Sequence, residues 1–210
     1  MKKKIFLTVV LMLSGHAFAA APMPEGNVAN GKAQTLVCSA CHGNDGNSAA
    51  PSFPKLAGQG EKYLYKQLRD IRDGARPIAT MVGLLDTKTD QELADMAAYY
   101  ADQSMSGSQA DPEKLALGER IYRAGYAETG VAACMACHGP TGHGNALAGF
   151  PRLAGQHADY TKSQLIMYRK GFEDPSGRTN DGDTMVMRAN ARGLSDMQID
   201  AVSSYIAGLK

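Results

Sequence analysis

One sequence unit is written twice in this chain, and the repeat constrains the fold more than any other feature. A Cys-x-x-Cys-His motif at residues 38–42 recurs at residues 134–138, an offset of 96. The segment Phe53–Gln59 recurs almost unchanged as Phe150–Gln156, at an offset of 97. A repeat of this length predicts two similar structural units, each carrying one motif.

Each unit ends with a helical pattern. Thr89–Glu92 and Ser195–Gln198 have the pattern of a capping box, and they lie at an offset of 106. Apolar residues follow each box at helical spacing, and no long stretch alternates apolar with polar residues as a strand would. The sequence predicts an all-α fold of two tandem helical domains, with helices near residues 31–42, 61–73, 89–102, 114–124, 130–138, 158–170 and 195–208.

The boundary between the domains is expected in a stretch of small and polar residues. Residues 103–112 consist mainly of Ser, Gln, Gly and Ala and end in Pro. We therefore expect an N-terminal domain over residues 20–102, a linker over 103–112 and a C-terminal domain over 113–210. The second unit contains nine extra residues after Gly171, in polar sequence around Glu173–Gly177 that is typical of a loop.

Residues 1–19 have the pattern of a secretory signal peptide. Three lysines precede the apolar run Ile5–Leu13, and a small-residue cleavage site ends at Ala19. A membrane anchor is disfavoured, because a bilayer helix needs about 20 apolar residues. Removal of the peptide leaves 19 Lys and Arg against 21 Asp and Glu. This slightly acidic balance makes nucleic acid an unexpected partner.

The Cys-x-x-Cys-His motif is the attachment sequence of covalently bound haem c. On one helical turn, the two cysteines share a face and the histidine lies beside them. Cys38, Cys41, Cys134 and Cys137 are therefore predicted to form thioethers to two haems, and His42 and His138 to bind the two irons.

Three other uses of the cysteines compete with haem attachment. Disulfides persist in exported proteins, but both cysteine pairs are followed at once by histidine. A zinc site of four cysteines normally has its two pairs 15–20 residues apart, whereas 92 residues separate Cys41 from Cys134. A thiol-disulfide oxidoreductase places its motif beside a sheet, and no strand is predicted here.

The second axial ligand of each iron is predicted to be methionine. Outside the motifs, His143 and His157 both lie in the second unit, so a shared design cannot use histidine. Met81 lies eight residues before one capping box and Met187 lies eight residues before the other. Met185 is out of register and remains the alternative to Met187. A histidine and a methionine would close each iron to substrates and raise its reduction potential.

Each of three further repeated pairs has two candidate roles. The backbone near Pro54 and Pro151 could accept the second ring N–H of each motif histidine, or the prolines could only shape a turn. Lys55 and Arg152 could pair with haem propionates or remain solvated. Tyr63 and Tyr160 could donate hydrogen bonds near a haem edge, or they could only pack.

With these residues in place, the chain closely resembles the dihaem cytochrome c4 family over nearly all of the mature sequence. The resemblance rests on both Cys-x-x-Cys-His motifs, on Phe53–Gly60 with Phe150–His157, and on Arg178–Arg188. It implies two class I cytochrome c domains packed face to face about a pseudo-twofold axis, with His and Met ligation through Met81 and Met187. It also implies a periplasmic carrier, often associated with the membrane, that passes electrons towards a terminal oxidase.

The predicted function is single-electron transfer without bound substrate, so the chain is not expected to be an enzyme. The expected partners are a quinol-oxidising cytochrome complex and a terminal oxidase of a respiratory chain. The alternatives are a haem subunit of a dehydrogenase and, less favoured, a dihaem peroxidase. A peroxidase needs one iron with an open position, and a registered methionine in both units argues against it.

Overall fold

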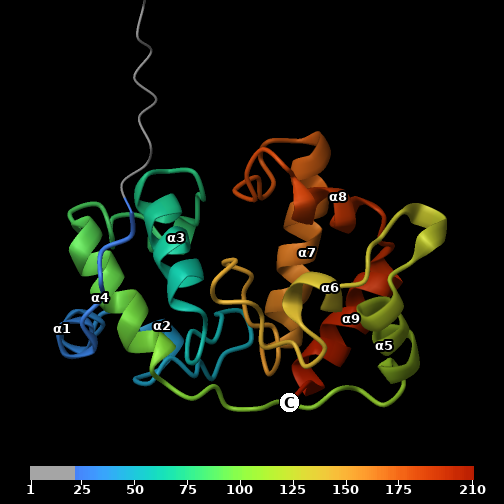
Figure 1. The fold of residues 1–210 in the computed structure, drawn as a ribbon, viewed down its shortest axis with the longest axis horizontal. Helices are drawn as coiled ribbons and strands as arrows, with labels where there is room; N and C mark the ends of the chain where they lie inside the picture. The colour runs from blue at the N-terminus through green and yellow to red at the C-terminus, as the bar shows by residue number, and fades with distance from the viewer. Residues whose placement is uncertain (1–21) are drawn as a thin grey trace, which may run out of the picture.

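The computed structural model describes residues 22–210, which form two helical lobes joined by an extended segment (Figure 1). The predicted signal peptide lies outside the described residues. Within residues 22–210, the only β-structure is two isolated bridges, Tyr126 with Val131 and Asn145 with Phe150. The all-α fold with two tandem domains is therefore confirmed, while the proposed domain boundaries stay a prediction.

The N-terminal lobe is built around one long helix that closes the unit. Its elements are α1 (Val28–Gln34), α2 (Ser39–His42), α3 (Glu61–Arg72), the 3₁₀ turn η1 (Ala79–Met81) and α4 (Asp90–Ala101). Both α1 and α3 pack against α4, where Leu93 and Met96 are buried. Gly31 allows α1 to approach closely, because a Cβ there would lie 2.0 Å from the Asp95 carbonyl oxygen.

The C-terminal lobe repeats this arrangement with a longer set of helices. Its elements are α5 (Leu115–Ala124), the 3₁₀ turn η2 (Ala127–Thr129), α6 (Met135–His138), α7 (Ala158–Glu173), α8 (Val186–Arg192) and α9 (Asp196–Gly208). Helix α9 packs against α5 and α7, and Ile121, Ile199 and Val202 are buried between them. Gly118 is the counterpart of Gly31, since a Cβ there would lie 2.3 Å from the Ala201 carbonyl oxygen.

Both predicted capping boxes are confirmed. The Thr89 side chain accepts from the Glu92 backbone N–H while the Glu92 carboxylate accepts from the Thr89 N–H. Ser195 and Gln198 form the same reciprocal pair at the start of α9. Each box satisfies donors that a helix N-terminus would otherwise leave free, which fixes where α4 and α9 begin.

Two predicted helices are wrong in their extent. The helix predicted over 31–42 is two helices, because α1 ends at Gln34 and a turn intervenes before Ser39. The helix predicted over 130–138 shrinks to Met135–His138, because Tyr126 and Val131 bridge across a turn instead. In both domains the helix that carries the motif is therefore a single turn. Helix α8 and the two 3₁₀ turns were not predicted.

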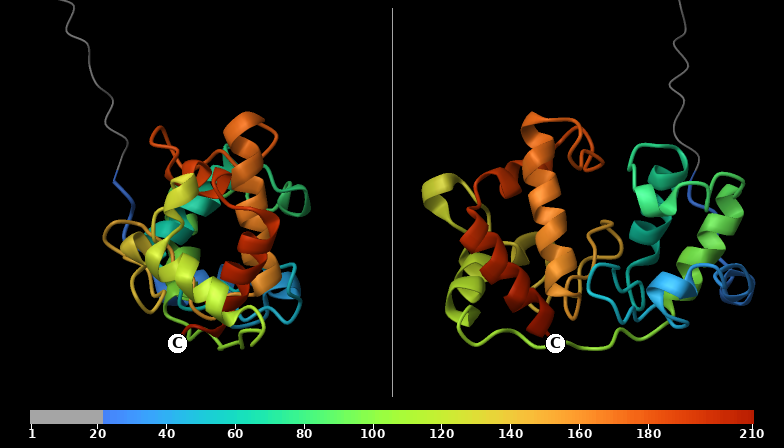
Figure 2. Two further views of the ribbon diagram at one scale, coloured as in Figure 1. Left: turned by 90° about the vertical axis from the view of Figure 1, so that its right-hand side faces the viewer. Right: turned by 180° about the vertical axis from the view of Figure 1, so that it is seen from behind.

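The lobes face each other across the loops that follow the two motifs. The loop between α2 and α3 meets the loop between α6 and α7 at the centre of the molecule, while the segment from α4 to α5 runs along one side (Figure 2). None of the helices within residues 22–210 has the length and apolar character needed to cross a membrane.

Candidate haem sites

The two motifs adopt the same local geometry. In each, a single helical turn lets the backbone N–H of the histidine donate to the carbonyl oxygen of the first cysteine. The N–O distance is 2.9 Å from His42 to Cys38 and 3.0 Å from His138 to Cys134. A glycine with positive φ, Gly43 at 79° and Gly139 at 78°, ends each turn. Glycine adopts this conformation without the steric cost of a Cβ. Both cysteines and the histidine are thus presented from one compact turn.

Each motif histidine is oriented by a proline carbonyl. Nδ1 of His42 lies 2.9 Å from the Pro54 oxygen, and Nδ1 of His138 lies 2.9 Å from the Pro151 oxygen. Because a carbonyl only accepts, Nδ1 carries the proton and Nε2 keeps its lone pair for a metal. Burial lowers the pKa of both His42 and His138, although the hydrogen bond to proline opposes this shift. The rings are therefore neutral at pH 7 and suited to bind iron.

The first cysteine of each motif lies in a setting that disfavours a thiolate. Burial raises the pKa of Cys38, and it raises the pKa of Cys134 to about 11. Reactive cysteines and thiolate metal ligands need the opposite shift. The four thiols are unpaired, and within residues 22–210 no group of three or more His, Cys, Asp or Glu side chains is placed to share a metal ion. The thioether role fits this setting, because it does not depend on a stable thiolate.

The two predicted methionine ligands lie in different local structures. Met81 ends the turn η1 and packs, together with Cys38, against the buried core of the N-terminal lobe. Met187 lies in the first turn of α8, where its N–H donates to Asp181 Oδ2 at 3.1 Å. Met185 precedes α8 in a left-handed conformation, with a φ of 48°, and its side chain is exposed. The half-buried Met187 is thus better placed than Met185 to face the interior.

The surroundings of the motifs fit a haem in each lobe. An aromatic edge contacts each histidine ring, with centroids 6.2 Å apart for His42 and Phe53 and also for His138 and Phe150. The buried hydroxyl of Tyr100 has no hydrogen-bond partner among the described residues, and Tyr100 belongs to the buried core against which Cys38 packs. A neutral imidazole with a free Nε2, two adjacent thiols and an apolar wall form the donor set that haem c requires.

The proline carbonyls orient the two histidines, and the repeated basic pair donates to backbone oxygens. The buried Lys55 ammonium donates to the backbone oxygens of Ser106 and Gly155, at 2.7 and 3.1 Å. Nε of Arg152 donates to the Ala154 oxygen at 3.2 Å. Neither side chain is free in solvent, and both hold backbone near the domain interface.

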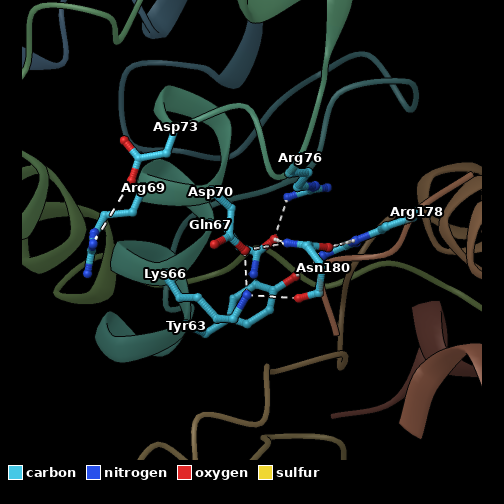
Figure 3. Close-up of polar contacts among 9 residues, drawn as sticks. All are labelled: Tyr63, Lys66, Gln67, Arg69, Asp70, Asp73, Arg76, Arg178 and Asn180. Carbon is cyan, nitrogen blue, oxygen red and sulfur yellow. Dashed lines mark hydrogen bonds and ion pairs between the residues drawn. The ribbon is translucent and has the colours of Figure 1, made fainter. Parts of the chain in front are cut away.

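A polar cluster joins the two lobes, and Figure 3 shows the part of it between α3 and the segment after α7 that carries Arg178 and Asn180. Arg76 donates to Gln67 of its own domain at 2.9 Å, and to Tyr160 and Gln164 of the other at 3.0 and 3.1 Å. Arg178, in the C-terminal domain, donates to Gln164 and Asn180 of its own domain at 2.7 and 2.8 Å. It also donates to Tyr63 and Gln67 of the N-terminal domain at 3.3 and 2.8 Å. The two arginines are thus equivalent about a pseudo-twofold relation.

The sequence assigned no role to either arginine of this cluster, although Arg178 opens one of the segments that carry the family resemblance. They lie at an offset of 102, which matches neither the 97 of the α3 and α7 segments nor the 106 of the capping boxes. Both guanidinium groups are buried, and a buried charge needs compensation. Tyr168 supplies part of it for Arg178, whose guanidinium carbon lies 4.4 Å from the ring centroid. Their equivalence is visible only in three dimensions.

Comparison with known proteins finds one family throughout. The family model described as Cytochrome c matches residues 28–104 and again residues 115–210. Cytochrome c4 of Pseudomonas aeruginosa is 52% identical over 208 residues, which cover 99% of this chain and 98% of that protein. The crystal structure of reduced recombinant cytochrome c4 from Pseudomonas stutzeri superimposes with a TM-score of 0.84 at 50% identity, covering 88% of this chain and all of that one.

A more distant relative has a name that describes a different role. A protein of Stutzerimonas stutzeri named thiosulfate dehydrogenase electron acceptor is 35% identical over 205 residues, covering 95% of this chain and 91% of that protein. Both kinds of relative match essentially the whole two-domain chain. The relatives with either name thus share the length and two-domain extent of this chain.

Proposed function

The chain belongs to the cytochrome c4 family of dihaem electron carriers, and from this premise we propose that it carries single electrons in the periplasm from a quinol-oxidising complex towards a terminal oxidase. Proteins of this family are carriers and not enzymes. The observation that supports the proposal most strongly is the paired geometry of His42 with Pro54 and of His138 with Pro151. Two equivalent metal-binding histidines suit two relay sites in one molecule.

Haem iron supplies the one-electron change of oxidation state. Cys38 and Cys41 would hold one haem by thioethers, and Cys134 and Cys137 the other. His42 and His138 would each offer Nε2 to an iron while Nδ1–H stays fixed on a proline oxygen. A ring fixed in this way does not reorient when the charge on its metal changes, which keeps the reorganisation energy low.

Met81 and Met187 would complete the coordination. A thioether sulfur is a neutral ligand that favours Fe(II), so His and Met together raise the reduction potential above that of two histidines. The position of Met81 against the same core as Cys38 supports this role in the N-terminal lobe. In the C-terminal lobe the bond from the Met187 N–H to Asp181 supports it, because this bond fixes the start of α8.

A role as electron acceptor of a dehydrogenase is the second candidate function. The similarity to the thiosulfate dehydrogenase electron acceptor of Stutzerimonas stutzeri supports it. Reduction of the purified ferric protein by a thiosulfate dehydrogenase with thiosulfate would distinguish the candidates. Fast reduction in that assay, with none by a quinol-oxidising complex, would favour the dehydrogenase partner.

Mass spectrometry and an optical spectrum of the same exported sample test the central proposal. We expect loss of residues 1–19, addition of two haem masses, and the near-infrared absorption of ferric haem bound to methionine sulfur. Free or disulfide-linked cysteines, or high-spin haem that consumes peroxide, would contradict the proposal. Fractionation of cells into periplasm and membranes tests the location and any peripheral membrane association.

A further inference from the structure

The peptide group that follows Pro54 and the one that follows Pro151 each have two hydrogen-bond partners, one in each domain. The Pro54 oxygen accepts from Nδ1 of His42 at 2.9 Å, and the Lys55 N–H of the same peptide unit donates to Oε1 of Gln156 at 2.9 Å. Gln156 belongs to the other lobe. An unbroken hydrogen-bond chain therefore runs from an amide of the C-terminal domain, through one peptide group, to the histidine of the N-terminal domain.

The same chain exists in the opposite direction. The Pro151 oxygen accepts from Nδ1 of His138 at 2.9 Å, and the Arg152 N–H of that peptide donates to Oε1 of Gln59 at 2.7 Å. Gln59 and Gln156 are equivalent positions of the repeat. Each domain thus places one glutamine on the peptide that supports the histidine of its neighbour.

The orientation of both glutamine amides is fixed by their other bonds. Oε1 of Gln156 also accepts from the His157 N–H at 3.0 Å, and its Nε2 donates to the Lys55 oxygen at 2.9 Å. Gln59 repeats this with the Gly60 N–H and the Arg152 oxygen, both at 2.9 Å. An atom that faces two N–H donors must be the oxygen. Both side chains are only 5% exposed, so water does not compete.

Such a chain strengthens its own members. When the N–H of a peptide is bound, its carbonyl becomes more polarised and accepts more strongly. A stronger bond from Nδ1–H makes the imidazole more electron-rich at Nε2, which stabilises the ferric state of a bound iron and lowers its potential. Removal of the glutamine acceptor should therefore raise the potential of the haem in the opposite domain.

We propose that Gln59 and Gln156 are positioning residues that tune the two haems crosswise: Gln156 tunes the haem held by His42, and Gln59 tunes the haem held by His138. The glutamines act through the Pro54–Lys55 and Pro151–Arg152 peptides and do not touch the haems. The inference rests on the proposed electron-carrier function. It gives the domain interface a part in setting both potentials, beyond holding the lobes together.

Spectroelectrochemical titration of the holoprotein tests the crossed pattern. Gln156→Met and Gln59→Met are matched variants, because methionine has a similar shape but lacks the amide donor and acceptor. Gln156→Met should raise the midpoint potential of the N-terminal haem and leave the other unchanged, and Gln59→Met should do the reverse. Met81→His, which should lower the N-terminal potential, identifies which wave belongs to which haem.

A glutamine that only holds the interface together would give a different result. Loosened domains would expose both haems to solvent and shift both waves under either substitution. That result would overturn the proposal, and so would a shift confined to the haem of the mutated domain. A wild-type protein without two one-electron waves would overturn the proposed function as well.

A second variant covers the case in which Gln156→Met does not fold. Gln156→Glu keeps an acceptor for the Lys55 N–H but loses the donor to the Lys55 oxygen. The N-terminal potential should then stay at or below the wild-type value. A rise in that potential would overturn the proposal, because the acceptor would be present without its effect.

Discussion

The two domains hold their histidines identically but support their methionines differently. Met81 ends a 3₁₀ turn and is followed by the exposed Val82. Met187 is the second residue of the regular helix α8 and is followed by Arg188, which pairs with Asp181 at 2.6 Å. Val82 and Arg188 are equivalent at the offset of 106. The spacing of the two predicted methionine ligands is thus preserved although the local structure that supports each of them differs.

The histidine supports differ less because they depend on backbone groups. A proline carbonyl remains in place whatever side chains surround it, so both copies keep the same 2.9 Å distance. The methionine supports depend on side chains, and these have diverged. The N-terminal segment relies on packing against the lobe core, whereas the C-terminal segment relies on a buried ion pair.

Removal of either methionine should have the largest effect. Met81→Ala and Met187→Ala should each abolish one of two equal contributions to the near-infrared band and lower the potential of one haem, because an open or water-bound iron replaces the sulfur ligand. Optical titration of the ferric protein measures both changes. Met185→Ala is the matched control and should change neither, and loss of a band in that variant instead of Met187→Ala would identify Met185 as the ligand.

Removal of Asp181 should break the C-terminal support alone. Asp181→Ala leaves Arg188 without its partner and the N–H groups of Met187 and Arg188 without their acceptor. We expect a loss of about 3 kcal/mol in the free energy of unfolding, since unpairing a largely buried ion is costly. Denaturant titration measures this loss. The matched control is Asp86→Ala in the N-terminal methionine segment, where Asp86 is exposed, and an equal loss there would contradict the asymmetry.

The crossing helices should respond alike in both domains. Gly31→Ala and Gly118→Ala each place a Cβ against a backbone oxygen of the partner helix, so α1 and α4, or α5 and α9, must separate. We expect each change to cost about 1–3 kcal/mol of stability, measured by thermal or denaturant unfolding. Gly74→Ala would not serve as control because its φ is positive. Gly107→Ala in the linker, with open space around it, should have little effect.

Substitutions in the capping boxes should have the smallest effects on stability, and these effects should be similar in the two domains. Thr89→Ala and Ser195→Ala each remove one acceptor at a helix N-terminus, at an expected cost of about 1 kcal/mol. Thr89→Ser and Ser195→Thr keep the acceptor and should be nearly neutral. Unfolding midpoints measure the difference, and a cost several times larger in one domain would show that the two closing helices contribute unequally to stability.

Sequence reasoning succeeded where a property depends on neighbours along the chain. The Cys-x-x-Cys-His turns, both capping boxes and the helices at 61–73, 158–170 and 195–208 follow from local spacing, and the structure contains them with small shifts at the ends. It failed for the helix over 31–42, because the chain must turn between α1 and α2 to present Cys38 and His42 to the lobe interior. That requirement comes from packing.

Local patterns along the chain were enough to predict two helical domains with one haem attachment turn each, and to align Met81 with Met187. How the two domains are coupled could be learned only from their arrangement in space. Arg76 with Arg178, and Gln59 with Gln156, act on partners about 100 residues away. The physical reason is that such bonds depend on how two folded surfaces meet, which no local periodicity encodes, whereas a helical turn or a cap is complete within a few residues.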